Sequence, residues 1–239
     1  GTGAITVGHT SGSADAELSG YHSLNFANPI TVASGSSGIL KISSGGNSSL
    51  TTTFSGAISI NRDLVITTAG PSGPSTLVIS GGITGTGNIS IVNTSVRTTT
   101  ISTTSINNTG TITNSGGGSG TTTISATIGS NVTSLIQNSA TSALSLSGAK
   151  TLSGSLAVTA GTLTHTSTLA IGTTLTVSDG GTFTQGAGLV TVSGNTTIGG
   201  GTSGVFTAHT SGQTLNGNLT LAVGSTWTKA ASGNLAFAH

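Results

Sequence analysis

Two carboxylates near the start of the chain, Asp15 and Glu17, are the residues best suited to chemistry. They stand two positions apart, so an extended strand would place both side chains on one face. Two carboxyl groups held side by side can act as general acid and general base, as in the cleavage of polysaccharides. Two solvated acids in a capping segment explain the same spacing more simply, and we favour that interpretation.

Two histidines, His9 and His22, flank these acids. Imidazole and carboxylate groups are all competent metal ligands, so the four side chains together suggest a metal site. Their spacing matches no established metal motif, however. We therefore predict no catalytic, cofactor-binding or metal-binding residues and expect the chain not to be an enzyme. A carbohydrate-active enzyme ranks third among the hypotheses, because the whole sequence holds only 4 acidic residues.

Other candidate motifs are better read as corners of the chain. Adjacent Arg62 and Asp63 follow an Asn and predict a surface turn with a weak ion pair. Asp179 precedes two glycines and predicts a second turn. Residues 116–120 are as glycine-rich as a phosphate-binding loop, yet no Lys-Ser/Thr pair follows them, so we predict an ordinary loop.

Threonine is abundant and admits two interpretations. Triplets of threonine occupy residues 51–53, 98–100 and 121–123. Threonine ladders on a flat face can organise water and bind ice, but threonine is also a good outward residue in any strand. Asn-x-Ser/Thr triplets begin at Asn88, Asn131, Asn195 and Asn218. In a chain this rich in Ser and Thr they arise by chance and do not establish glycosylation.

The composition excludes several classes of protein. Only 4% of the 239 residues are charged and the net charge is +1, against about 25% charged in ordinary soluble domains. No basic surface for nucleic acid or for anionic membranes can form. The absence of Cys removes disulfides and zinc-thiolate sites. A hydrophobic content of 33% with only 3 Pro argues against disorder, and the apolar runs are too short for a transmembrane helix.

Degenerate repeats dominate the rest of the chain. Leu156-Ala157-Val158 leads to a Gly-Thr-Leu phrase, and Leu175-Thr176-Val177 leads to a Gly-Thr-Phe phrase. Period-two alternation within each apolar stretch, with Gly, Asn or Ser between stretches, predicts short strands separated by tight corners. We expect these strands to stack as a parallel β-helix, a β-solenoid, with right-handed winding preferred.

The repeat spacing predicts the size of the solenoid. The step from Leu156 to Leu175 suggests a three-sided coil of roughly 19 residues, hence about 12 coils at about 4.8 Å each. Small outward residues and aliphatic inward residues should alternate. The residues predicted to point inward are Leu156, Val158, Leu163, Leu169, Ile171, Leu175, Val177 and Phe183.

The first 28 residues differ from the others, since they hold half of the acids and the only Tyr. We predict that residues 1–28 form an N-terminal cap or assembly segment and that residues 29–239 form the β-solenoid repeats. Because the chain lacks Met and a charged-then-apolar leader, we expect a processed mature form or a piece of a longer protein.

The phrase Leu-x-Val-x-x-Gly-Gly-Thr-Phe from Leu175 to Phe183 resembles the Gly- and Thr-rich β-strand repeats of bacterial autotransporter passengers and giant surface proteins. The resemblance covers residues 150–237 well, 58–148 loosely and 1–28 hardly at all. It implies secretion, a parallel β-helix and a structural or adhesive role at the cell surface, and it carries no catalytic residues.

These observations predict an extracellular bacterial structural protein, a β-solenoid subunit or segment of a surface filament, layer or adhesive stalk. The alternative is a glycan-binding or ice-binding β-solenoid module. We expect copies to associate end to end, with Ala4-Ile5-Thr6-Val7 adding a strand to a neighbour's edge. Glycans and host or cell surfaces are further expected partners, whereas nucleic acid is not.

Overall fold

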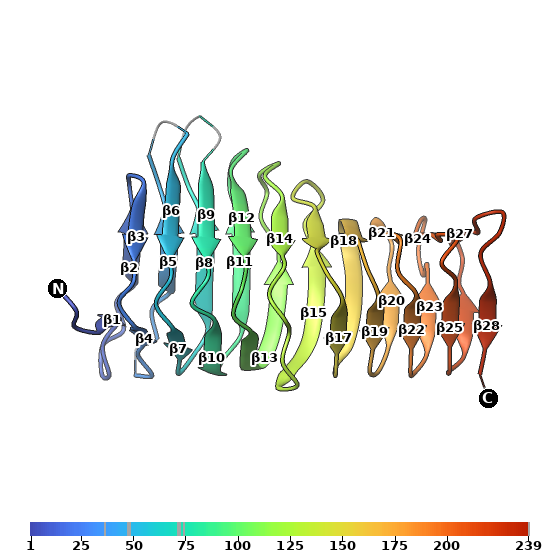
Figure 1. Ribbon diagram of the computed structural model, residues 1–239, viewed down its shortest axis with the longest axis horizontal. Coiled ribbons are helices and arrows are strands. Elements are labelled where there is room, and N and C mark those ends of the chain that lie inside the picture. Colours follow the sequence, from blue (N-terminus) through green and yellow to red (C-terminus); the bar gives the residue numbers. More distant parts are fainter. Residues whose placement is uncertain (36, 47–48, 71–72, 74, 239) are drawn as a thin grey trace.

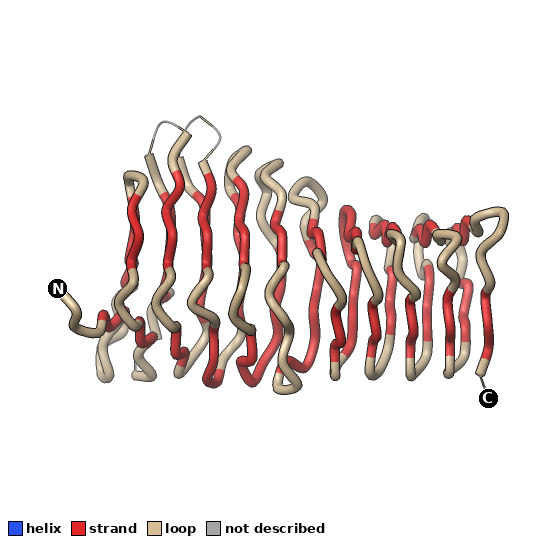
Figure 2. The backbone as a smooth tube through the Cα atoms, in the orientation of Figure 1, coloured by secondary structure: helices blue, strands red, loops and turns tan. Residues whose placement is uncertain are grey.

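The computed structural model describes residues 1–35, 37–46, 49–70, 73 and 75–238, and this part of the chain contains strands and no helix (Figures 1 and 2). It therefore offers no helix that could cross a membrane. The chain coils around one long axis, and each strand pairs in parallel with the strand one coil further along. The predicted parallel β-helix is confirmed. Its right-handed winding stays a prediction.

Each coil runs through three faces in turn, which we call A or D, then B, then C. Face A contains β1 (Ile5–Val7), β4 (Ile30–Val32), β7 (Ile58–Ile60), β10 (Ile83–Thr86) and the first part of β13 (Ile106–Asn114). Face D takes the same place in the later coils, with β17 (Lys150–Leu152), β19 (Leu169–Ile171), β22 (Val190–Val192), β25 (Gln213–Leu215) and β28 (Leu235–Phe237).

Faces B and C run the whole length of the rod. Face B contains β2 (Ala16–Gly20), β5 (Leu40–Ser44), β8 (Leu64–Thr68), β11 (Ile89–Asn93), the second part of β13, β15 (Val132–Asn138), the first part of β18 (Ser155–His165), β20 (Leu175–Val177), β23 (Thr196–Ile198) and β26 (Leu219–Leu221). Face C contains β3 (Leu24–Phe26), β6 (Thr51–Phe54), β9 (Thr76–Ile79), β12 (Thr98–Ile101), β14 (Thr122–Ile124), β16 (Leu144–Leu146), the second part of β18, β21 (Gly181–Thr184), β24 (Val205–Thr207) and β27 (Thr226–Thr228).

The interior consists of stacked aliphatic columns. In β20, Leu175 and Val177 are fully buried while Thr176 between them faces outward. Leu175 lies in register with Leu156 of the preceding coil, so apolar side chains of successive coils cover one another. All eight residues predicted to point inward are completely buried, which confirms the predicted core.

The predicted coil length of roughly 19 residues is wrong for most of the rod. Leu156 does pair with Leu175, 19 positions later, but Ile30 pairs with Ile58, 28 positions later. The extra residues lie in two corners: residues 33–39 separate β4 from β5 and residues 45–50 separate β5 from β6, whereas only residues 172–174 separate β19 from β20 and β18 passes from face B to face C without a break. The chain therefore forms about 10 coils instead of 12, giving a rod of about 50 Å.

The predicted N-terminal segment forms the first coil of the same solenoid. Its strands β1, β2 and β3 pair in parallel with β4, β5 and β6 of the second coil. The role of residues 1–28 as a cap or assembly segment stays a prediction. His239, the last residue of the predicted repeat region, lies outside the described residues.

Candidate functional site

Both acids of the first coil bind the second coil. Asp15 lies just before β2, and its Oδ1 accepts the backbone N–H of Ile39 at 2.6 Å. Glu17, an outward residue of β2, accepts the hydroxyl of Ser43 on β5. Both side chains are exposed. These contacts explain the two carboxylates as links between neighbouring coils.

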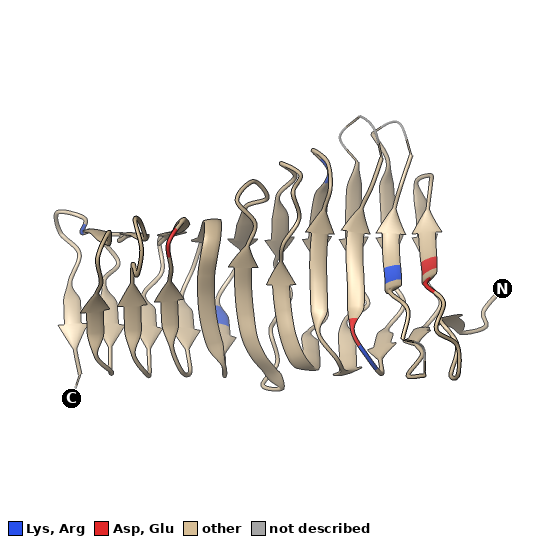
Figure 3. Cartoon of the chain, turned by 180° about the vertical axis from the view of Figure 1, so that it is seen from behind, with Lys and Arg blue, Asp and Glu red and all other residues tan. Residues whose placement is uncertain are grey.

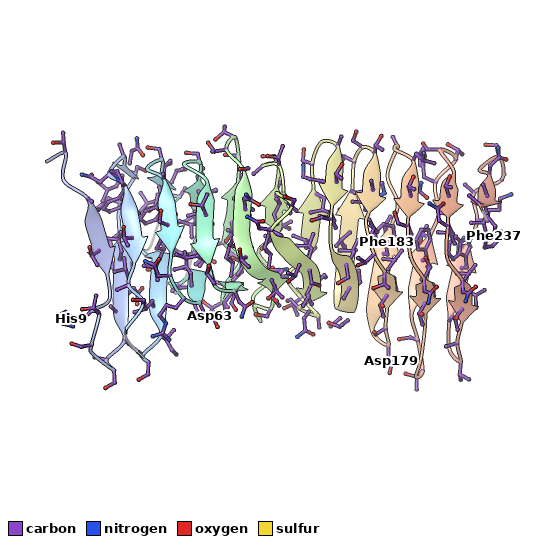
Figure 4. The ribbon with its side chains drawn as sticks, turned by 90° about the horizontal axis from the view of Figure 1, so that it is seen from below. His9, Asp63, Asp179, Phe183 and Phe237 are labelled. Carbon is purple, nitrogen blue, oxygen red and sulfur yellow. The ribbon has the colours of Figure 1, made fainter. Side chains whose placement is uncertain are left out.

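The structure does not gather the suggested metal ligands into one site. Nδ1 of His9 accepts the backbone N–H of Ser11 at 3.2 Å, and His9 lies at the N-terminal end of the rod (Figure 4). Within the described ranges, no three His, Cys, Asp or Glu side chains come together as a metal-binding group. The suggested site of His9, Asp15, Glu17 and His22 is therefore not formed.

Corner residues repeat the same kind of link along the rod. Asp63 Oδ1 accepts the N–H of Asn88 at 2.8 Å, and Asn88 Oδ1 accepts the N–H of Thr111 at 2.9 Å. Asp63 thus holds the corner of the next coil in place, and Asn88 in that corner holds the corner of the coil after it. The predicted ion pair of Arg62 with Asp63 is wrong, because the Asp63 carboxylate turns to the next coil.

Asp179 is the most heavily bonded of these corner acceptors. Its Oδ1 accepts the N–H of Ser203 at 2.7 Å, the Ser203 hydroxyl at 2.8 Å and the Thr202 hydroxyl at 3.0 Å. The Ser203 hydroxyl is the main cause, and Thr202 the next, of a lowered pKa for this carboxyl. The predicted turn is confirmed, since Gly180 adopts φ +79° directly after it. Asp63 and Asp179, labelled toward the lower edge of Figure 4, are exposed, whereas Phe183 is completely buried.

A buried polar network at the corner between faces B and C was not predicted. Asn93 Nδ2 donates to Thr122 Oγ1 at 3.0 Å, and its Oδ1 accepts the Thr99 hydroxyl at 2.6 Å. In the next coil, Asn114 Nδ2 donates to Gln137 Oε1 at 2.7 Å. All five side chains are completely buried. The signal was present in the sequence, because the inward alternation of Ile89 and Ile91 continues into Asn93.

Buried basic residues also escaped the sequence analysis. Arg97 is completely buried and donates through Nη2 to the carbonyl of Gly46. Lys150 begins β17 at an inward position, where its Nζ donates to the carbonyls of Ser125 at 3.3 Å and of Ser147. Burial lowers the pKa of the Lys150 amine. These cations are held by backbone carbonyls, and Figure 3 shows how sparse charge is along the rod.

Rings stack along the inside of face C. Phe183 lies over Phe206 with centroids 4.8 Å apart, and Phe206 lies over Trp227 at 4.2 Å. His165 contacts the other side of Phe183 at 5.6 Å. A second stack joins Phe26 and Phe54 at 4.8 Å near the other end of the rod. The first and last described coils on this face thus both present an aromatic side chain to the axis.

The outside of face C carries two columns of small residues, all β-branched or hydroxyl-bearing except Asn25. The first column consists of Thr51, Thr76 and Thr98 in the early coils and of Thr162, Thr182, Val205 and Thr226 in the later ones. The second column has one residue in each coil: Asn25, Thr53, Val78, Thr100, Thr123, Ser145, Thr164, Thr184, Thr207 and Thr228. Neither column contains a charged residue. Neighbours within a column are about 4.8 Å apart, and the two columns are about 7 Å apart.

No family model matches this chain, and no curated protein and no solved structure matches it either.

Proposed function

We propose that this chain is a segment of an extracellular bacterial structural protein, in which the β-solenoid forms part of a surface filament, layer or adhesive stalk. The low charge, the small outward side chains and the repeat phrase at Leu175 to Phe183 support this proposal. A rod of about 10 stacked coils is better suited to hold two points apart than to form an active site. Antibody labelling of intact source cells tests the location, and labelling seen only after lysis would contradict it.

The observation that carries the proposal is the match between the two end coils. The first coil directs Ile5 of face A, Leu18 of face B and Phe26 of face C toward the interior, and all three pack on the core from the end. The last described coil offers Leu235 of face D and Trp227 of face C in the same way. Both coils run through the three faces in the same order. A second copy can therefore stack with β1, β2 and β3 beside β28, β26 and β27.

Such stacking predicts head-to-tail association, which two end variants test. Leu24 in β3 is 44% exposed and Phe237 in β28 is 50% exposed, at opposite ends of the rod. Leu24→Asp should block the first end and Phe237→Asp the last, so each variant alone should be monomeric by analytical ultracentrifugation. A mixture should form dimers only, because one intact end remains on each partner.

The matched control is Val96→Asp, since Val96 is 56% exposed at a mid-rod corner. This variant should associate like the unmodified chain. Deletion of residues 1–8, which removes β1, should weaken association if that strand adds to the neighbour's edge. A monomer of the unmodified chain at high concentration, or mixed end variants that stay monomeric, would contradict end-to-end stacking.

Ice binding is a second candidate function, favoured by the two threonine columns on face C. Hydroxyl and methyl groups repeat there at two regular spacings on an uncharged surface, a pattern suited to ordering water. Thr184→Lys would interrupt the second column, whereas Thr191→Lys on β22 changes an outward threonine of face D. We expect the unmodified chain and Thr191→Lys to inhibit ice recrystallisation and Thr184→Lys to lose that effect. Equal behaviour of the two variants would contradict this candidate.

A further inference from the structure

A cavity of about 190 Å³ lies beside the first coils of face B. Glu17, Tyr21, Ser43, Ser44 and Gly45 are among its lining residues. The cavity lies below the roughly 300–1,000 Å³ of pockets that hold drug-sized ligands. The described residues of its lining include one carboxylate, Glu17, and no cation. Lys41 lies beside Glu17 in the register of β2 and β5, so the formal charges of this pair cancel and a small, uncharged and polar molecule suits the cavity.

The aromatic wall of the cavity is Tyr21, which directly follows β2. Tyr21 is the only Tyr of the chain, and its side chain is 62% exposed, so one face of the ring is open to a ligand. The ring lies against Gly45 so closely that a Cβ on that residue would approach Cε1 to 2.8 Å. Only glycine at position 45 therefore lets the ring keep this position. Tyrosine in such a setting offers an apolar face together with a polar hydroxyl.

The polar wall of the cavity comes from β2 and β5. The Ser43 hydroxyl donates to Glu17 and shares a 2.7 Å hydrogen bond with the Ser19 hydroxyl. An ionised carboxylate has acceptor sites for about four hydrogen bonds, so Glu17 can accept further ones. Ser44 is 99% buried, and its Oγ has no hydrogen-bond partner among the residues that the structure describes. Within the described ranges, this hydroxyl is therefore the one lining group of the polar wall whose hydrogen-bonding capacity is unused.

We propose that this cavity binds one neutral sugar ring. The C–H face of the sugar would lie on the Tyr21 ring, and its hydroxyl groups would donate to the Glu17 carboxylate. Acidic sugars should bind more weakly because they would bring a second negative charge to Glu17. This inference rests on the adhesive role proposed above and names the chemistry by which it would act. A contact of this size should have a dissociation constant of about 1 mM.

The single tyrosine makes the test specific, because every tyrosine ring signal in the NMR spectrum comes from Tyr21. We would record NMR spectra of the chain labelled at tyrosine while adding glucose, galactose, mannose, N-acetylglucosamine, glucuronic acid or sialic acid. At least one neutral sugar should shift the Tyr21 ring signals in a saturable way, and the acidic sugars should act more weakly. By surface plasmon resonance on the immobilised sugar, Tyr21→Ala should weaken binding about tenfold, and Glu17→Gln should weaken it measurably.

The matched control is Val223→Ala, which alters an exposed apolar side chain at the far end of the rod and should leave binding unchanged. The proposal is overturned if no neutral sugar shifts the Tyr21 signals, or if Tyr21→Ala binds as tightly as the unmodified chain. It is also overturned if the signals respond only to protein concentration, which would assign the ring to a contact between copies. Ultracentrifugation of Tyr21→Ala distinguishes the two proposals, since continued association would leave the structural role standing.

Discussion

The rings of Phe206 and Trp227 lie nearly parallel, with 4.2 Å between their centroids and 4° between their planes. They occupy equivalent positions in β24 and β27, so the stack follows directly from the parallel register of face C. Stacked aromatic pairs contribute about 0.5–1.5 kcal/mol beyond the area that they bury.

Phe206→Leu should lower the free energy of unfolding by about 1–2 kcal/mol, since the change preserves apolar character but removes the stack. The emission of Trp227, the only Trp, should shift to longer wavelength because its indole loses a covering ring. Fluorescence-monitored urea unfolding measures both effects. Phe54→Leu is the matched control: it removes the Phe26 stack and should leave Trp227 emission unchanged. Equal spectra for Phe206→Leu and the unmodified chain would contradict the stack.

Leu175→Asp should destabilise the rod by about 3–5 kcal/mol, because it places an unpaired carboxylate in the aliphatic interior. Thr176→Asp alters the adjacent outward residue and should cost about 0.5 kcal/mol. Thermal unfolding followed by circular dichroism gives the comparison. Equal melting temperatures for the two variants would contradict the alternation described for β20, and a lower one for Thr176→Asp would indicate the reverse alternation.

The hydrogen bonds that Asp179 accepts from Thr202 and Ser203 should make the stability of the fold depend on pH. The pKa of Asp179 is lowered in the folded state, so the ionised carboxylate stabilises the fold above the ordinary value of 3.8, and this contribution disappears as the pH falls through the folded-state pKa. Asp179→Ala should therefore melt below the unmodified chain at pH 6, and the difference should shrink toward pH 2. Melting curves across this range provide the measurement, and a difference independent of pH would argue against this role of the hydrogen bonds.

His165 should make the folded state less stable at acidic pH, whereas a histidine in a salt bridge makes it more stable there. Burial lowers its pKa below 6.5, with His209 adding to this effect and the hydrogen bond from Nδ1 to the Ser167 carbonyl at 2.5 Å opposing it. Phe183 covers one side of the ring, and Nε2 has no partner in the described part of the chain. The neutral form is thus favoured on folding, and stability should fall as the pH drops below about 6.5, where the unfolded chain binds the proton first.

The variant His165→Leu should reduce this loss of stability between pH 7 and pH 5. His22→Leu, which alters an exposed histidine, should keep it. Urea unfolding at several pH values distinguishes the two variants. A pH dependence that survives unchanged in His165→Leu would assign the effect to another group.

The fold was predictable from the sequence where local pattern decides the structure, as in β20, whose alternation of Leu175, Thr176 and Val177 reads directly as in, out and in. The number of residues in a coil was not predictable from the sequence. The corners differ in length from coil to coil, whereas the strands keep the same register. The inward position of Lys150 depends in part on the carbonyl of Ser125 in the preceding coil, which no local pattern encodes. The Tyr21 cavity was hidden for the same reason, since Gly45 lies 24 residues away from the ring in sequence.

The variable coil length has a mechanical consequence. The hydrogen bonds between coils run along the rod, so tension applied to its two ends pulls directly on the coil at each end. When that coil detaches, it releases between 19 and 28 residues, as the register of Leu156 with Leu175 and of Ile30 with Ile58 shows. Each release lengthens the tether by about 60–100 Å. Under load, the rod would lengthen in discrete and unequal steps, and the coils that remain stacked would keep their shape.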